Sequence, residues 1–323
     1  MILKTHYGVF NSSINRDILK SKYVRRLDKI FQDDLSPVFC IQASKATRLE
    51  HTLGVVHLAT LVNVSKEEKK LLEYSALLHD IGLPCFGHIG ESVMQRILGK
   101  DHEENAISII EKGEVEAILK SDGILDEIIK IFRREHYLSD LIFGSIDLDN
   151  IDNLYVYQIK RNKIPKHNSL KLASSFSVEN QKIFFNINNI NEIKKWKRTR
   201  YDVYSFLMKK EHLIRSSMLE EAIFYYCLKD KSLLDLDNSI AIKRLLDYKP
   251  SRNLIERLIN NKLLAPKYFK ILNSNAKAPK KKKDWAILNR GEVRLDKEVV
   301  VNTIKGKVKL NKIHEDKVVY IAF

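Results

Sequence analysis

Residues 66–91 read KEEKKLLEYSALLHDIGLPCFGHIGE. The apolar residues in this stretch recur at helical spacing, so we expect a helix over residues 66–80 with one buried face. Gly82 and Pro84 follow directly and predict where the helix ends, because glycine is common just beyond a helix and proline does not continue one.

A histidine and an aspartate, His79 and Asp80, close the buried face of this helix. Burying an imidazole and a carboxylate is costly unless something satisfies them, and a metal ion does so because both groups are metal ligands. A further candidate ligand, His51, lies in line with apolar residues on an earlier helix expected over residues 48–63, with Thr47 as its N-cap. Additional carboxylates follow in the sequence GSIDLDNIDNL, at Asp147, Asp149 and Asp152.

This order of histidine, adjacent histidine and aspartate, and later aspartate resembles the metal-binding signature of the HD-domain phosphohydrolases. It is most similar to the branch that contains the deoxynucleoside triphosphate (dNTP) triphosphohydrolases. The resemblance covers roughly residues 5–156 and fades to scattered similarity up to about residue 269. It implies a mainly α fold, an HD-domain helical bundle, in which one divalent ion (Mn, Fe, Co, Ni, Zn or Mg) is held by His51, His79, Asp80 and Asp149. Asp147 and Asp152 would then cap a helix or hold neighbouring side chains.

The same resemblance implies roles around the substrate. Arg48 lies one helical turn before His51, and a guanidinium beside a metal site suits a phosphate oxygen. The resemblance assigns phosphate contacts to Arg48, His88 and, more loosely, Lys210, and a sugar contact to Gln32. The catalytic residues it implies are His102 as general acid, Glu91 as the carboxylate that orients it, and Asp80. Caps and surface ion pairs are the structural alternatives for these side chains.

Four positions depart from the family pattern. Leu83 stands where members commonly carry a second histidine. After the last metal ligand, dNTP triphosphohydrolases carry a lysine, a tyrosine and an aspartate that serve phosphate and sugar. This chain has Asn150, Asn153 and Tyr157 at those positions, which puts specificity for a dNTP in doubt but leaves phosphoester hydrolysis in place.

The bulk composition favours an anionic partner. The 323 residues carry a formal net charge of +15, which favours nucleic acid, nucleotides or an acidic surface, although a general richness in Lys, Ile and Asn explains the charge as well. No run of eighteen apolar residues occurs, the first residues lack a signal-peptide pattern, and the three cysteines are widely spaced. We therefore expect a cytoplasmic protein with reduced thiols and no membrane partner.

The chain divides into three parts by pattern. Residues 1–270 are expected to form the helical domain, with a β-hairpin inserted at about residues 165–190, where residues 170–187 alternate loosely around a turn at Asn180. Residues 271–284 have the composition of a basic linker. Residues 285–323 predict three short strands, a small β-rich C-terminal appendage that would complete an oligomer interface or bind a polyanion.

A basic cluster with an interleaved aromatic residue follows the hairpin. Such a composition is typical of an edge that binds nucleic acid, and a solvated charged face is the alternative. The residues concerned are Lys194, Lys195, Trp196, Lys197 and Arg198.

Three functions remain open at this point. The first is hydrolysis of a dNTP to deoxynucleoside and triphosphate. The second is an HD-type nuclease or phosphodiesterase acting on single-stranded nucleic acid or cyclic nucleotides. The third is a nucleic-acid-binding module with a structural metal site. The complete ligand set favours an enzyme, and homo-oligomerisation is an expectation from the family alone.

Overall fold

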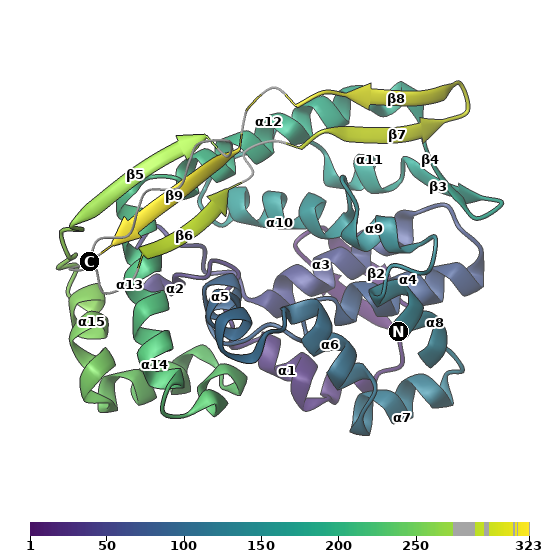
Figure 1. The fold of residues 1–323 in the computed structure, drawn as a ribbon. Coiled ribbons are helices and arrows are strands. Elements are labelled where there is room, and N and C mark those ends of the chain that lie inside the picture. The colour runs from purple at the N-terminus through teal and green to yellow at the C-terminus, as the bar shows by residue number, and fades with distance from the viewer. Residues whose placement is uncertain (274–287, 294–296, 313, 315, 323) are drawn as a thin grey trace.

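The computed structural model describes residues 1–273, 288–293, 297–312, 314 and 316–322. The expectation of a mainly α fold is confirmed (Figure 1). The α-helices are α1 (Lys22–Leu27), α2 (Ser36–Phe39), α3 (Arg48–Leu61), α4 (Lys66–Leu78), α5 (Gly87–Leu98), α6 (His102–Ile110), α7 (Gly113–Ser121), α8 (Leu125–Phe132), α9 (Ser139–Phe143), α10 (Leu148–Ile159), α11 (Ser169–Ala173), α12 (Ile190–Leu207), α13 (Lys210–Cys227), α14 (Asn238–Asp247) and α15 (Lys249–Ile259).

Short strands complete the fold. They are β1 (Ile2–Thr5), β2 (Gly8–Asn11), β3 (Phe176–Glu179), β4 (Lys182–Phe185), β5 (Tyr268–Asn273), β6 (Leu288–Val293), β7 (Val299–Thr303), β8 (Gly306–Leu310) and β9 (Lys317–Ala322). All of their described pairings within sheets are antiparallel. No helix among the described residues is long and apolar enough to cross a lipid bilayer.

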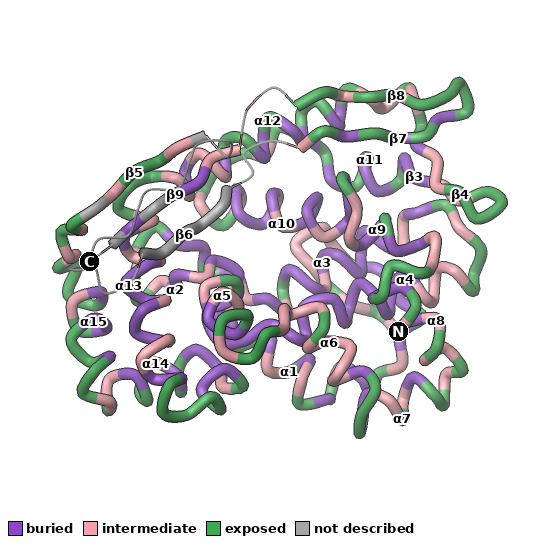
Figure 2. Tube along the Cα trace, in the orientation of Figure 1, coloured by how far each residue is buried: buried purple, intermediate pink, exposed green. Residues whose placement is uncertain are grey.

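Helices α3 and α4 pack against each other at the centre of the larger core, and α10 packs on α3. Figure 2 shows that α3 and α10 are largely buried, and the second half of α4 is buried as well. Both α3 and α4 begin with a complete capping box, Thr47 with Glu50 and Ser65 with Glu68. Their starts are therefore fixed by local hydrogen bonds, while their apolar faces fix how they pack.

A second, smaller core lies beside the first. It is formed by α13, α14 and α15 together with α5 and α2. Between the cores the chain turns sharply where α5 begins, at its N-cap Phe86 and first residue Gly87, which both have positive φ. A Cβ at position 87 would lie 2.1 Å from Asp34 Oδ1 and 3.0 Å from Arg48 Nη2, so only glycine leaves room for that ion pair.

The inserted hairpin is present as β3 and β4, joined by a two-residue turn at Asn180 and Gln181, which both have positive φ. The residues before it differ from the expected alternation, because Ser169–Ala173 forms the short helix α11. An Asn168 side chain caps this helix, and Leu172 and Ala173 pack into the core.

The C-terminal strands are more numerous than the three expected. Strand β5, which begins within the predicted helical domain, pairs with β9, and β9 pairs with β6. The β7–β8 hairpin packs by itself on the main core: Val299 and Val301 are buried there, and Asn302 Nδ2 donates to the carbonyl of Ile183 on β4 at 3.3 Å. Residues 271–273 of the expected linker are part of β5, and residues 274–284 lie outside the described residues.

Candidate metal centre and active site

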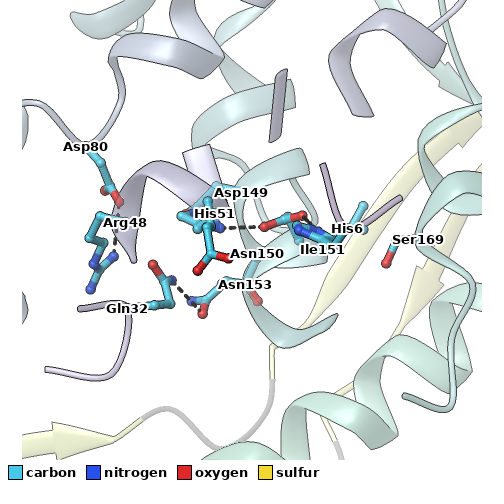
Figure 3. A network of polar contacts seen from close by, with 12 residues as sticks. His6, Gln32, Arg48, His51, Asp80, Asp149, Asn150, Ile151, Asn153 and Ser169 are labelled. Carbon is cyan, nitrogen blue, oxygen red and sulfur yellow. Dashed lines mark hydrogen bonds and ion pairs between the residues drawn. The ribbon is translucent and has the colours of Figure 1, made fainter. Parts of the chain in front are cut away.

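The four predicted metal ligands converge from three helices. His51 comes from the middle of α3, His79 and Asp80 from the end of α4, and Asp149 from the first turn of α10. Ligand atoms of His51, His79 and Asp80 all lie within 4.8 Å of one another. Asp149 Oδ1 lies 2.9 Å from His51 Nε2 and 3.6 Å from His79 Nε2, so it closes the same cluster. Figure 3 shows His51 and Asp149 side by side, with Asp80 and Arg48 next to them.

The hydrogen bonds of the two imidazoles indicate that a cation belongs between them. His51 Nδ1–H donates to Asp152 Oδ2 at 2.7 Å, and His79 Nδ1–H donates to the carbonyl of Ala76 at 2.7 Å. Each ring therefore directs Nε2 toward the other, and the two Nε2 atoms lie 3.3 Å apart. In the neutral tautomer these Nε2 atoms carry lone pairs, and carboxylates surround them. Acceptors can gather in this way around a proton or a metal ion, and two imidazoles with two carboxylates match a divalent transition metal.

The pKa values of the cluster also favour a positive charge between the ligands. Burial would lower the pKa of His51, but its hydrogen bonds to Asp149 and Asp152 raise that pKa to about 10. Hydrogen bonds from His51 and His79 hold the pKa of Asp149 well below its usual range despite its desolvation. Without a metal ion, the anionic cluster thus retains a proton on the imidazole. A bound cation would replace that proton.

Asp152 is the outer partner that fixes His51. It is fully buried, and its second oxygen, Oδ1, lies 2.7 Å from His6 Nε2, in the turn between β1 and β2. A Cβ at Gly54 would lie 2.2 Å from Asp152 Oδ1 and 2.5 Å from His6 Cε1, so the glycine of α3 makes this arrangement possible. The sequence had suggested a holding role for Asp152. It gave no signal for His6, which lies 146 residues away in the chain.

Arg48 lies at the edge of the cluster, as its place one turn before His51 predicts. It is only 3% exposed, with Nη1 donating to Asp80 Oδ2 at 3.1 Å and Nη2 donating to Asp34 Oδ1 at 2.9 Å. Its buried Nε has no hydrogen-bond partner in the part of the chain that the structure describes. The guanidinium is held by two carboxylates and keeps one donor for a further acceptor.

Glu91 joins two histidines in a second polar group next to Arg48. Its Oε1 accepts from His102 at 2.6 Å and its Oε2 lies 2.9 Å from His88 Nδ1. Desolvation would raise the pKa of Glu91, but its hydrogen bonds with His102 and His88 hold it well below its usual range. His102 opens α6, where Asp101 provides the capping box, so its ring is fixed at a helix start. The predicted pairing of Glu91 with His102 is therefore present in the geometry, while their catalytic roles stay predictions.

Three of the residues that depart from the family pattern form hydrogen bonds with other side chains of the protein. Asn153 Oδ1 accepts from Gln32 Nε2 at 3.0 Å, which Figure 3 shows beside Asp149 and Arg48. Tyr157 donates to Asp33 Oδ2 at 2.6 Å, and Asn150 Oδ1 accepts from Arg200 Nη1 at 3.0 Å. Leu83 is buried. The Oε1 atom of Gln32 has no partner among the described residues, so this amide keeps an acceptor beside the cluster.

Lys210 lies elsewhere. It begins α13, and its ammonium lies 5.4 Å from the ring centroid of Phe269. It lines a cavity of about 610 Å³ together with Arg215 and His212. Its described contacts do not include the metal cluster, so the expected phosphate contact of Lys210 stays a prediction.

The prediction that Trp196 and Lys197 lie on an exposed nucleic-acid-binding edge is wrong. Trp196 is fully buried in the main core, and Lys197 is only 7% exposed, with Nζ donating to the carbonyls of Lys297 at 2.6 Å and Asn311 at 2.9 Å. Helix α12 turns the Trp196 ring into the core, where it cannot stack on a base, and the Lys197 ammonium is held by two backbone carbonyls. Lys194, Lys195 and Arg198 are exposed on the same helix.

Comparisons with known proteins agree with this geometry. Residues 48–165, which carry all four predicted ligands, match the HD domain family. The chain is 31% identical over 150 residues to the uncharacterized protein MJ1154 of Methanocaldococcus jannaschii, which covers 46% of this chain and 31% of that protein. It is 37% identical over 109 residues to a deoxyguanosinetriphosphate triphosphohydrolase-like protein of Caldanaerobacter subterraneus, which covers 33% of this chain and 30% of that protein. The matched part of the chain thus spans less than a third of the length of either relative.

The fold resembles solved structures over its whole length. A phosphohydrolase of Bacteroides thetaiotaomicron superposes with a TM-score of 0.75 at 18% identity, covering 100% of this chain and 99% of that one. A hypothetical protein of Aquifex aeolicus superposes with a TM-score of 0.74 at 21% identity, covering 99% and 96%. The shared architecture therefore includes the C-terminal strands as well as the helical bundle.

Proposed function

Because this chain belongs to the HD-domain phosphohydrolase superfamily, we propose that it is a metal-dependent hydrolase of nucleotide phosphates, with dNTPs as its substrates. The observation that carries the proposal is the convergence of His51 Nε2 and His79 Nε2 with Asp80 and Asp149, beside a buried arginine. This arrangement places a site for a metal ion beside the guanidinium of Arg48, which would bind a phosphate.

His51, His79, Asp80 and Asp149 would hold one divalent ion. When bound, that ion would supply polarisation of a phosphoryl oxygen and a water molecule of lowered pKa. The protein holds the ligands before the ion arrives, because Asp152 and the Ala76 carbonyl fix both imidazoles in the tautomer with Nε2 free.

Arg48 would stabilise negative charge on the phosphates. Its Nε is unpartnered among the described residues, and its two Nη groups are already fixed by Asp34 and Asp80. A guanidinium held rigidly in this way loses little side-chain entropy when it binds an anion.

His102 and Glu91 would supply the leaving-group proton. Hydrolysis of a dNTP to deoxynucleoside and triphosphate breaks the bond between the 5′ oxygen and the α phosphorus, and water provides the oxygen that replaces it. The departing 5′ oxygen needs a proton, which a histidine can give near neutral pH. Glu91 accepts a hydrogen bond from His102 Nδ1, so the opposite ring nitrogen is the one that can face a substrate.

A second candidate function is supported by the residues around Gln32. Asn153 and Tyr157 are bound to Gln32 and Asp33 rather than free for a deoxyribose, and Asn150 is bound to Arg200. A site without dedicated sugar contacts suits a phosphodiester in single-stranded nucleic acid or a cyclic nucleotide. The same metal cluster would serve that chemistry.

One product analysis distinguishes dNTP hydrolysis from cleavage of a phosphodiester. The purified, Mn-loaded protein is offered the four dNTPs and a labelled single-stranded oligonucleotide, with the Asp80→Asn variant as the inactive control. Deoxynucleoside and triphosphate are the expected products. Shortened oligonucleotide with intact dNTPs would replace the first function by the second, and turnover by Asp80→Asn equal to that of the unchanged protein would overturn both.

A further inference from the structure

A basic pocket lies outside the metal centre, between α12 and the end of the β7–β8 hairpin. It encloses about 480 Å³. Its lining consists of Lys166, Lys194, Lys197, Arg198, Tyr201, Asp202, Lys309, Leu310, Asn311 and His314. From α12, Lys194, Arg198 and Tyr201 share one helical face, because they are separated by four and three residues. Trp196 and Arg200 point from the same helix into the protein, where Arg200 reaches Asn150. The pocket is therefore separated from the metal ligands by α12.

The charges of this pocket are unbalanced. Five cationic side chains line it, and two of them are paired with carboxylates: Lys166 with Asp202 at 2.6 Å and Lys309 with Glu298 at 2.9 Å. Lys194 and Arg198 are exposed and form no salt bridge with any residue that the structure describes. Two cations facing one cavity without a counter-charge repel each other, and an anionic ligand would relieve that repulsion.

One wall of the pocket is aromatic. The rings of Tyr201 and His314 stack at 3.9 Å between centroids and 24° between planes. Tyr201 is also partly open to solvent. A flat aromatic surface next to free cations is the combination that binds a nucleobase and its phosphate together.

Positive charge continues beyond the pocket along the hairpin. Lys307 and Lys309 on β8 are both exposed, and being two residues apart on a strand they point to the same side. Lys305 precedes them in the exposed turn between β7 and β8. A single nucleotide would fill the pocket alone, whereas this row of lysines suits a ligand that extends past it. The formal net charge of +15 agrees with a polyanion.

We propose that the pocket between α12 and the β7–β8 hairpin binds single-stranded nucleic acid, with one base against Tyr201 and adjacent phosphates on Lys194 and Arg198. This site is distinct from the metal centre and does not depend on the reaction proposed for it. Of the predicted basic edge it keeps Lys194 and Arg198 as phosphate contacts, and Tyr201 takes the place of Trp196 as the aromatic residue.

The test is direct binding of a labelled oligothymidylate of about twenty nucleotides, followed by fluorescence anisotropy at several salt concentrations. A denaturing gel afterwards confirms that the oligonucleotide is intact. The double variant Lys194→Ala/Arg198→Ala is expected to lose about tenfold in affinity and to reduce the slope of log K against log salt by about 1.4. Tyr201→Ala is expected to lose about tenfold with an unchanged slope, and Tyr201→Phe to bind normally.

The matched control is Lys243→Ala/Arg244→Ala, which removes one exposed lysine and one exposed arginine from α14. It should bind like the unchanged protein. Equal affinity of the α12 double variant and the unchanged protein would overturn the proposal. So would competition by thymidine monophosphate at the concentration at which the oligonucleotide binds, because the site would then hold a single nucleotide. Because binding is measured without turnover, absence of any hydrolytic activity leaves this result intact.

Discussion

The Nδ1–H of His51 donates to Oδ2 of Asp152 at 2.7 Å, and this contact joins the metal-facing helix α3 to α10 inside the core. Asp152 exposes no surface and makes its second contact with His6 of the N-terminal hairpin. The imidazole of His51, a predicted metal ligand, is thus positioned by a carboxylate outside the predicted ligand set. Such outer partners fix both the tautomer and the ring orientation.

We expect Asp152→Asn to weaken metal binding by about 10- to 100-fold. The amide has the shape of the carboxylate but no charge to hold the imidazole proton on Nδ1. The dissociation constant for Mn, measured by calorimetry on the metal-free protein, gives the result. Asp140→Asn, which changes an exposed aspartate on α9, is the matched control. Unchanged affinity in Asp152→Asn would show that His51 is oriented by packing alone.

The two carboxylates that hold Arg48 should separate metal binding from phosphate binding. Asp80→Asn removes a metal ligand, so both bound metal and hydrolysis should be lost, with activity falling by at least about 100-fold. Asp34→Asn removes only the other partner of Arg48 and should retain the metal while kcat/KM falls by about tenfold. Metal content is measured by elemental analysis and activity on the same samples. Loss of the metal from Asp34→Asn would contradict the assignment.

Glu91→Gln should keep the metal and lower hydrolysis by about 10²- to 10⁴-fold, the range of a lost general acid. The same substitution should also change the titration of His88. Partial desolvation would lower the pKa of His88, but the hydrogen bond to Glu91 raises it above its usual value. The protonated His88 and its contribution to stability are therefore present at low pH and lost as pH rises through the raised pKa.

In Glu91→Gln this loss should move to lower pH. Proton NMR of the His88 ring across the titration measures the shift directly, with Glu67→Gln, which changes an exposed glutamate on α4, as a control. If the His88 pKa is the same in Glu91→Gln and in the unchanged protein, the hydrogen bond between His88 and Glu91 is not formed in solution.

The elements that the sequence predicts best are those whose signals are local. The capping residues Thr47 and Ser65 start α3 and α4, and the apolar periodicity that follows orients both helices. Those two helices also bring together His51, His79 and Asp80, so most of the metal cluster follows from the same pattern.

Contacts between distant segments leave no such pattern. The partners of Asp152, Asn150 and Tyr157 are His6, Arg200 and Asp33, each at least 50 residues away. Trp196 and Lys197 were misplaced for the same reason. Their basic neighbours suggest an exposed edge, but Trp196 packs in the main core. The Lys197 ammonium donates to the carbonyls of residues 297 and 311, which flank the β7–β8 hairpin about a hundred residues later.

Removing the metal should lower the melting temperature. Without a cation, the three buried ligands and Asp149 keep their charges and lone pairs together. A metal ion bound only by the folded state adds about 2.7 kcal/mol at one hundred times its dissociation constant. Thermal unfolding with Mn and with a chelator measures this difference. Asp80→Asn should show no difference between the two conditions. An equal response of Asp80→Asn to Mn would place the stabilising ion at another site.

His167 should set part of the acid sensitivity of the fold. Its ring is buried, with Nδ1 3.1 Å from Thr199 Oγ1, and burial lowers the pKa of His167 to about 4. The unfolded chain takes up the proton near pH 6.5 while the folded chain does not, so stability falls as pH drops below that value, by about 2 kcal/mol at pH 5. Urea unfolding of the metal-free protein at pH 7, 6 and 5 measures this fall, because metal loss then plays no part. His167→Gln should be less stable at pH 7, but its free energy of unfolding should change less between pH 7 and pH 5. An equally steep fall in His167→Gln would assign the acid sensitivity to other groups.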